Sequence, residues 1–221
     1  MMLDGPPVQA GLSAKMLRRR KAQAEQSAAM RARVFRAAVK CLQKQGYSAT
    51  TTLLVQKEAK ISRGAMLHHF PTRTDLMLFV VRTAFDDGVE MHRQCLEVTA
   101  NAERDLPDVA WKAASGSIGI AALEILMGAR SDPHLARKLK SLFGEIEREE
   151  FQLSASLDNS GGKLLSLTSV RTFYWALRGL TIANLVTEDP SEVVKCFEFL
   201  KLVFLTYRDI ERRKIQNSVS S

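Results

Sequence analysis

Residues 51–75 read TTLLVQKEAKISRGAMLHHFPTRTD, and this stretch decides the fold. The spacing of its apolar residues predicts two short helices, Thr51–Ala59 and Arg63–His69, which only a tight link separates. Pro71 stops the second helix, and the cap pair Thr72-Asp75 begins another. This is a helix-turn-helix pattern, in which the first helix holds the second in the major groove of DNA.

The rest of the chain is also predicted to be helical. Proline and glycine are sparse, strand-like alternation is absent, and apolar residues recur every three or four positions. The further helices expected are Glu25–Gln45, Arg73–Val98, Val109–Ala129, Pro133–Leu157, Leu164–Val186 and Ser191–Gln216. We therefore predict an all-α fold, with a three-helix DNA-binding domain over residues 25–75 and a helical domain over residues 76–221. Residues 1–24 are expected to be a flexible basic arm.

Charge is concentrated at the N-terminal end of the chain. The formal charge of the whole chain is +8, but residues 1–75 carry 14 basic and 4 acidic side chains while residues 76–221 carry 18 and 20. A cationic region around a helix-turn-helix is the electrostatic footprint of a nucleic-acid-binding protein. Within the arm, Arg18–Lys21 either enters the minor groove or is a solvated tail that raises non-specific affinity, and we favour the tail.

The second helix of the motif has a thin outward side. Placing residues 63–70 at 100° steps turns the bulky residues inward and Gly64, Ala65 and His68 outward. Small residues let the helix backbone approach base edges, and Ala65 fits against a thymine methyl group. Arg63 is placed to bind guanine bidentately.

Other side chains of the motif are suited to phosphates, which fix the register without reading the sequence. The predicted DNA-binding residues, with these phosphate contacts included, are Thr52, Arg63, Gly64, Ala65, His68, His69 and Arg73. In the plainer interpretation, Thr51 only caps its helix and both histidines are ordinary surface residues.

Several classes of protein are excluded. Cys41, Cys95 and Cys196 lie far apart and the four histidines lack metal-ligand spacing, so we expect neither a disulfide framework nor a metal site. No nucleophile motif or phosphate-binding glycine loop occurs, so an enzyme and a cofactor are not expected. The chain shows no signal peptide and no apolar segment long enough to span a membrane, which predicts a cytoplasmic protein.

A longer string carries a family resemblance. Residues 46–77, GYSATTTLLVQKEAKISRGAMLHHFPTRTDLM, resemble the DNA-binding segment of tetracycline-repressor (TetR) family regulators, and the resemblance covers roughly residues 28–80. It implies a homodimeric transcriptional regulator, most often a repressor, with a C-terminal ligand-binding and dimerisation domain. Filling an effector pocket would then move the fourth helix and release the double-stranded DNA operator. The alternative is an architectural or protein-recruiting DNA-binding factor without a small ligand.

Three residues depart from the family's usual pattern. Leu67 stands where the family usually has a phosphate-contacting tyrosine. Gln56 and Lys60 occupy positions usually held by alanine and glycine. We expect Gln56 to crowd the contact between the two motif helices, and Lys60 to adopt a turn that glycine enters more readily.

The last two helices have more apolar surface than one core needs. This predicts a symmetric dimer, although the same surface is also compatible with a monomer core. The predicted interface consists of a small-residue face and of apolar residues outside the core stripe of the last helix: Thr172, Ala176, Gly179, Ala183, Val194, Leu202 and Leu205.

For the effector pocket, Glu124 and Asn184 are the polar side chains that a plain core explains least. The expected walls are large side chains of the middle helices, namely Trp111, Met127, Phe143 and Trp175. Simple packing is the alternative for each of them.

Overall fold

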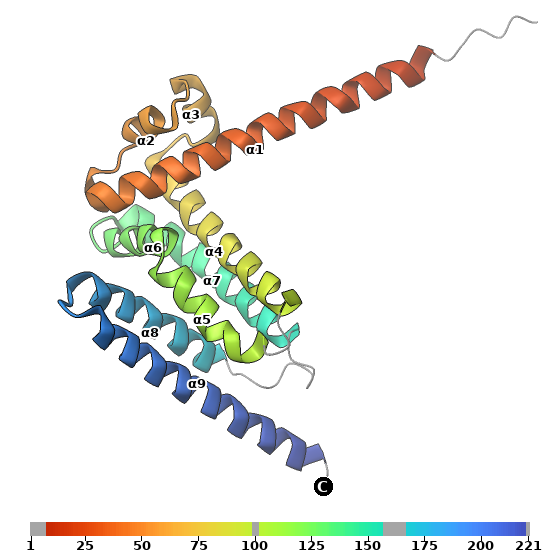
Figure 1. Ribbon diagram of the computed structural model, residues 1–221. Helices are drawn as coiled ribbons and strands as arrows, with labels where there is room; N and C mark the ends of the chain where they lie inside the picture. Colours follow the sequence, from red (N-terminus) through yellow and green to blue (C-terminus); the bar gives the residue numbers. More distant parts are fainter. Residues whose placement is uncertain (1–7, 99–101, 157–166, 220–221) are drawn as a thin grey trace, which may run out of the picture.

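The computed structural model describes residues 8–98, 102–156 and 167–219, which are helical almost throughout and contain no strand. This confirms the predicted all-α class. The helices are α1 (Val8–Ala49), α2 (Thr52–Ala59), α3 (Arg63–His69), α4 (Arg73–Val98), α5 (Ala102–Ser115), α6 (Ser117–Gly128), α7 (Pro133–Ser156), α8 (Leu167–Val186) and α9 (Pro190–Val219). Figure 1 shows α1–α3 as a head from which α4 descends into the body formed by the later helices.

Helix α1 is longer than predicted. It begins at Val8 rather than Glu25, so residues 8–24 are helical and not the flexible arm expected, while residues 1–7 lie outside the described part. The physical reason is composition, because alanine, glutamine, arginine and lysine propagate a helix that the buried half has already nucleated. At the other end, Gly46 has φ 70°, which breaks the regular helix directly after Gln45, where the sequence predicted its end.

The predicted single helix Val109–Ala129 is two helices, α5 and α6. Gly116 caps the start of α6, and a Cβ on Gly119 would lie 2.1 Å from the carbonyl oxygen of Ala114. The chain can therefore bend here, by 63° between Arg104–Ser115 and Ser117–Gly128, only because both positions lack a side chain. This bent pair is the one part of the described chain that has the length and apolarity of a membrane span; no single helix does.

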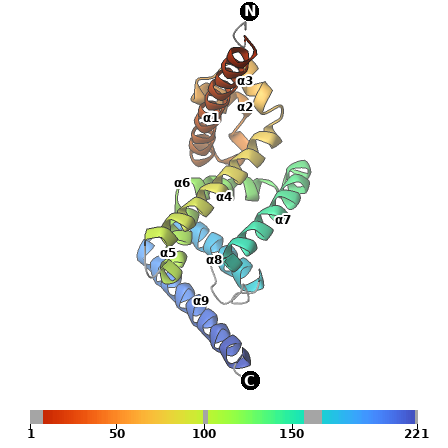
Figure 2. The same ribbon diagram turned by 90° about the vertical axis from the view of Figure 1, so that its right-hand side faces the viewer.

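The buried residues form two clusters. The larger one joins the head to the body, because it contains Val34 and Leu42 of α1, Met66 of α3, Ile125 of α6 and Leu139 of α7. The smaller one lies between α5, α8 and α9 and includes Phe173 and Leu177. Figure 2 shows α8 and α9 at the end of the molecule opposite the head.

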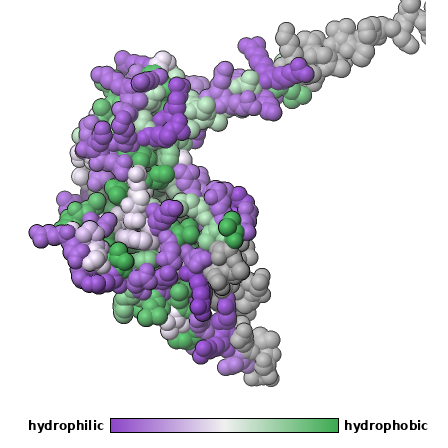
Figure 3. Space-filling model, viewed as in Figure 1, coloured by the Kyte–Doolittle hydropathy of each residue, from purple (hydrophilic) through white to green (hydrophobic). Residues whose placement is uncertain are grey.

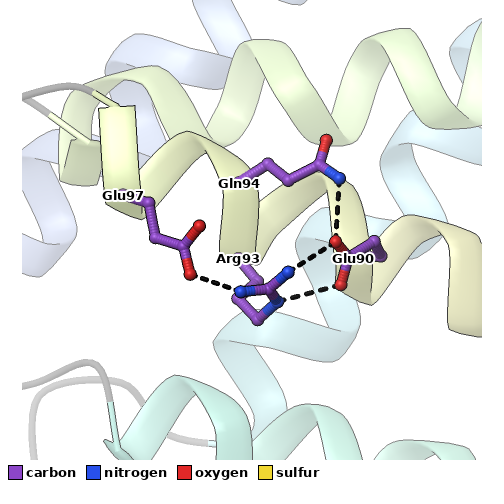
Figure 4. Close-up of polar contacts among 4 residues, drawn as sticks. All are labelled: Glu90, Arg93, Gln94 and Glu97. Atoms are coloured by element: carbon purple, nitrogen blue, oxygen red, sulfur yellow. Dashed lines mark hydrogen bonds and ion pairs between the residues drawn. The ribbon is translucent and has the colours of Figure 1, made fainter.

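Helix α4 connects the two parts and carries ion pairs along its exposed side. Figure 4 shows Arg93 between Glu90 and Glu97 on successive turns, with Gln94 also donating to Glu90. The hydrogen bonds from Arg93 and Gln94 lower the pKa of Glu90 to about 2. These pairs lie within one helix, so they favour its helical state rather than its attachment to neighbours.

Candidate nucleic-acid interface

The two helices of the motif begin at side-chain caps. The Thr51 hydroxyl accepts from the Leu54 amide (3.1 Å), and the Ser62 hydroxyl accepts from the Ala65 amide (3.1 Å). Both hydroxyls thus satisfy amides that a helix start otherwise leaves without an acceptor. Thr51 is therefore a cap, as the plainer interpretation had it, and α2 begins at Thr52.

The turn between the helices is left-handed at Lys60, with φ 53° and ψ 49°. This is the conformation that glycine enters more readily, as the sequence predicted. The Ile61 amide donates to the Gln56 carbonyl, and the Gln56 side-chain amide in turn donates to the Ile61 carbonyl (3.3 Å). The expectation that Gln56 crowds the motif is thus wrong, because its side chain closes the turn.

Buried side chains hold α3 in place. Met66 and Phe70 are each 2% exposed, and the ring of Phe70 lies 4.8 Å from that of Phe79 on α4. Val55 of α2 is fully buried in the same cluster. A helix of seven residues is not stable alone in water, so this packing must fix both its position and its rotation.

The outer side of α3 is accessible, as predicted. Arg63, Gly64 and His68 are exposed and Ala65 is half-buried. A Cβ on Gly64 would meet nothing within 4 Å, so the backbone is open to a partner there. Leu67, at the position where the family resemblance implies a tyrosine, is 48% exposed on the same helix.

Two of the predicted phosphate contacts, Thr52 and His69, are less exposed than the most accessible residues of α3. Thr52 and His69 are both half-buried, and burial lowers the pKa of His69, with further lowering by His68 and Arg31. These surroundings therefore favour the neutral form of His69 in the free protein, and the neutral ring can still offer a hydrogen bond.

Arg73 is turned inward, which corrects its assignment as a phosphate contact. Its Nε donates to the Thr50 carbonyl (2.8 Å), a terminal nitrogen donates to the Tyr47 carbonyl, and the guanidinium lies 3.9 Å from the Tyr47 ring centroid. The residue fixes the corner between α1 and α2. No local pattern indicates this contact, because Arg73 and Tyr47 are 26 positions apart.

The comparisons with known proteins agree with this geometry. Residues 34–80 match the sequence profile described as "Bacterial regulatory proteins, tetR family". The HTH-type transcriptional regulator CymR of Pseudomonas putida is 27% identical over 181 residues, which cover 77% of this chain and 87% of CymR. Residues 34–80 thus carry the DNA-binding segment of the TetR family, and the chain resembles the transcriptional regulators of that family over most of its length. This confirms the resemblance seen in the sequence and excludes an enzyme, and the matches give no support to an architectural factor.

Solved structures share the fold of this chain. A putative TetR-family regulator from Rhodococcus sp. has a TM-score of 0.59 at 16% identity, over 82% of this chain and 97% of that chain. The multidrug binding protein EbrR in complex with ethidium has a TM-score of 0.55 at 20% identity, over 80% of this chain and 98% of that one.

A polar junction ties the DNA-binding head to the body. The Tyr47 amide donates to Glu124 of α6 (3.0 Å), and the Tyr47 hydroxyl donates to Asp132 (2.8 Å), which precedes α7. The ring passes so close to Gly128 that a Cβ there would lie 2.2 Å from Tyr47 Cδ1. Burial and the Asp132 hydrogen bond raise the pKa of Tyr47 to about 12, so its hydroxyl remains a donor at neutral pH.

The structure does not bring the predicted effector residues together in one place. Phe143 and Trp175 do come together, with ring centroids 6.4 Å apart. Glu124 instead accepts from the head, and Trp111 stacks on Phe197 of α9 at 5.3 Å. The remaining two are exposed: Met127 and Asn184. Apolar periodicity shows which residues face inward, but it does not distinguish a packed interior from a cavity.

The body contains a polar pair that the sequence did not reveal. His92 Nδ1 lies 2.8 Å from the Gly88 carbonyl, which fixes the proton on that nitrogen, and Nε2 lies 3.5 Å from the Tyr174 hydroxyl of α8. Burial lowers the pKa of His92, so the ring is neutral at pH 7. No signal in the sequence links these residues, which are 82 positions apart.

The predicted dimer residues lie at or near the surface of α8 and α9. Thr172, Gly179, Val194 and Leu202 are exposed, while Ala176, Ala183 and Leu205 are half-buried. Further large apolar side chains of these helices are exposed, among them Ile182, Leu185, Val186, Phe199 and Val203. An apolar surface of this extent on a folded chain marks an interaction site.

Proposed function

We propose that this TetR-family regulator is a cytoplasmic homodimeric repressor that binds a specific operator and releases it when a small molecule binds its body. In this proposal Arg63, Gly64, Ala65 and His68 read the major groove, and Thr52 and His69 contact phosphates. The observation that carries the proposal is the rotation of α3, which buries Met66 and leaves Arg63, Gly64 and His68 exposed.

In the same proposal, two copies of the chain associate through the exposed apolar faces of α8 and α9. The resulting dimer binds one near-palindromic site. Two recognition helices about 34–36 Å apart match successive major grooves. The family of the chain and the exposed faces support this assembly.

For the response to a ligand, we propose that the effector binds beside His92 and Tyr174. A neutral imidazole and a phenol offer hydrogen bonds to an uncharged polar group on an otherwise apolar molecule. His92 lies on α4, which continues without a break into the head, so a shift of α4 reaches α3 through Phe79 and Phe70. The binding of ethidium by EbrR, a protein with the same fold, supports a small-molecule site.

Arg63→Ala tests the proposed reading of DNA. A duplex would be selected from a random pool with the wild-type protein, and affinity measured by fluorescence anisotropy against scrambled competitor. The variant should lose about 1–3 kcal/mol of discrimination, because a bidentate guanine contact is removed while the exposed side chain supports no packing. Circular dichroism and light scattering should remain unchanged.

Two results would contradict the proposed reading. One is an unchanged preference for the selected duplex in Arg63→Ala, and the other is a wild-type protein that selects no sequence at all.

The effector site is tested by repeating the DNA-binding measurement with candidate uncharged aromatic compounds. Such a compound should release the duplex less effectively from His92→Phe than from the wild type.

A further inference from the structure

We propose that the projecting part of α1, residues 16–29, is a second DNA-binding element that contacts phosphates flanking the half-site read by α3. The inference rests on the proposed function, because it assumes an operator bound by α3. It assigns a partner to a surface that the helix-turn-helix does not include.

The first observation is where α1 leaves the head. Met30 is 8% exposed and Val34 is fully buried, whereas residues 16–29 are exposed apart from the half-buried Ser27. The helix therefore projects by about 14 residues, or about 20 Å. Figure 1 shows it leaving beside α3 and pointing away from the body, and Figure 2 shows the same end beyond the head.

The second observation is charge. Residues 16–29 contain the four cations Arg18–Lys21 and a single acid, Glu25. All four cations are exposed, and Figure 3 shows hydrophilic residues along this projection beside a little apolar surface. That apolar surface comes from Met16 and Leu17, which are 66% and 63% exposed. A projection with so much positive charge suits a polyanion better than a protein groove.

The third observation is direction. Residues 18 positions apart lie on the same side of an α-helix, so Arg20 faces the same way as Ala38, which is fully buried in the larger cluster. Arg31, at the base of the projection, is close enough to lower the pKa of His69, the last residue of α3. The projection thus continues the side of the head from which α3 is presented.

Helical geometry also determines what the cations can recognise. Four consecutive residues at 100° steps surround the helix, so about two of them face a neighbouring duplex whatever its rotation. This suits phosphates, which fix position, and not base edges, which need one defined direction. The sequence alone favoured a solvated tail, but a helix holds the same cations at a fixed place beside α3.

The test compares two duplexes: the sequence selected by the wild-type protein, and the same sequence extended at each end by about one helical turn, or about 10 bp. In the test variant, Arg18, Arg19, Arg20 and Lys21 are all replaced by Gln. The matched control replaces four exposed cations of the body, Arg130, Arg137, Lys138 and Lys140, by Gln. Affinity is measured by anisotropy over a range of salt concentrations.

The wild type should bind the extended duplex at least tenfold more tightly than the short one. The test variant should lose this gain, and its plot of log affinity against log salt on the extended duplex should be less steep by about 3–4, for about two contacts in each of two protomers. The body control should keep both the gain and the slope.

A second variant, Ala24→Pro, keeps every cation but interrupts the helix between the cations and the head. It should also lose the gain from the extended duplex. Equal wild-type affinity for both duplexes, an equal loss in the body control, or an Ala24→Pro protein with the full gain would each overturn the inference. A wild type that prefers no sequence would instead contradict the proposed function.

Discussion

At the scale of single residues, Tyr47 is the point where the head and the body meet. Its amide, hydroxyl and carbonyl engage Glu124, Asp132 and Arg73, and its ring fills the space left by the missing side chain of Gly128. A tyrosine after a helix-ending glycine was part of the family resemblance in the sequence. Its partners, up to 85 positions away, could not be predicted, because local patterns carry no information about long-range pairs.

Asp132 should make the stability of this junction depend on pH. The Leu135 amide and the Tyr47 hydroxyl hold the pKa of Asp132 below its ordinary value of 3.8. A carboxyl with a lowered folded-state pKa contributes stability that is fully present above its unfolded pKa and is lost as the pH falls through the folded value. Asp132→Asn, which keeps a cap for α7, should therefore lose less stability than the wild type between about pH 5 and pH 3.

Urea unfolding followed by circular dichroism across this pH range provides the measurement. Tyr47→Phe removes only one of the two donors, so its pH profile should lie between those of the wild type and Asp132→Asn. Superimposable profiles for the three proteins would show that Asp132 does not stabilise the junction.

At the scale of elements, α3 spans the residues that the sequence predicted and α4 begins where predicted, because these boundaries depend on local caps and on Pro71. The break at Gly116 was missed, because the apolar spacing continues across Ser115–Ser117 as it would in one helix. What bends the chain there is the contact of Gly119 with the end of α5, and that contact exists only in three dimensions.

The left-handed turn at Lys60 provides a prediction about these elements. Lys60→Gly should stabilise the protein by about 1 kcal/mol, because glycine has no Cβ to disfavour a positive φ. The matched control is Lys57→Gly, which removes the same charge from an exposed position inside α2 and should cost about 1 kcal/mol. Chemical denaturation of both variants gives the comparison, and shifts of the same sign would exclude the conformational explanation.

At the scale of the whole molecule, the smaller buried cluster leaves much of the apolar surface of α8 and α9 uncovered. Val193 and Phe197 of α9 are buried, whereas the neighbouring faces of α8 and α9 are largely exposed. The sequence thus predicted an excess of apolar surface correctly. Which side of each helix another copy would cover depends on the packing of both helices together, and no single helical pattern contains that information.

Gly179→Leu should separate the proposed dimer into folded monomers. A Cβ at this position would meet nothing within 4 Å in one protomer, so the larger side chain fits the monomer and obstructs only a partner at the small-residue face. Gly144→Leu on α7, where a Cβ would approach only the flexible Arg148 side chain at 3.6 Å, is the control. Light scattering should give half the wild-type mass for Gly179→Leu alone, and an unaltered mass would refute the assigned face.

The close approach of Tyr47 to Gly128 has a consequence for engineering regulators from this chain. Grafting a foreign head onto this body brings a new residue to position 47, and any larger residue at position 128 would collide with the original tyrosine. Hybrid proteins should therefore fold well only when positions 46, 47, 124, 128 and 132 are transplanted as one set, wherever the splice point itself is placed.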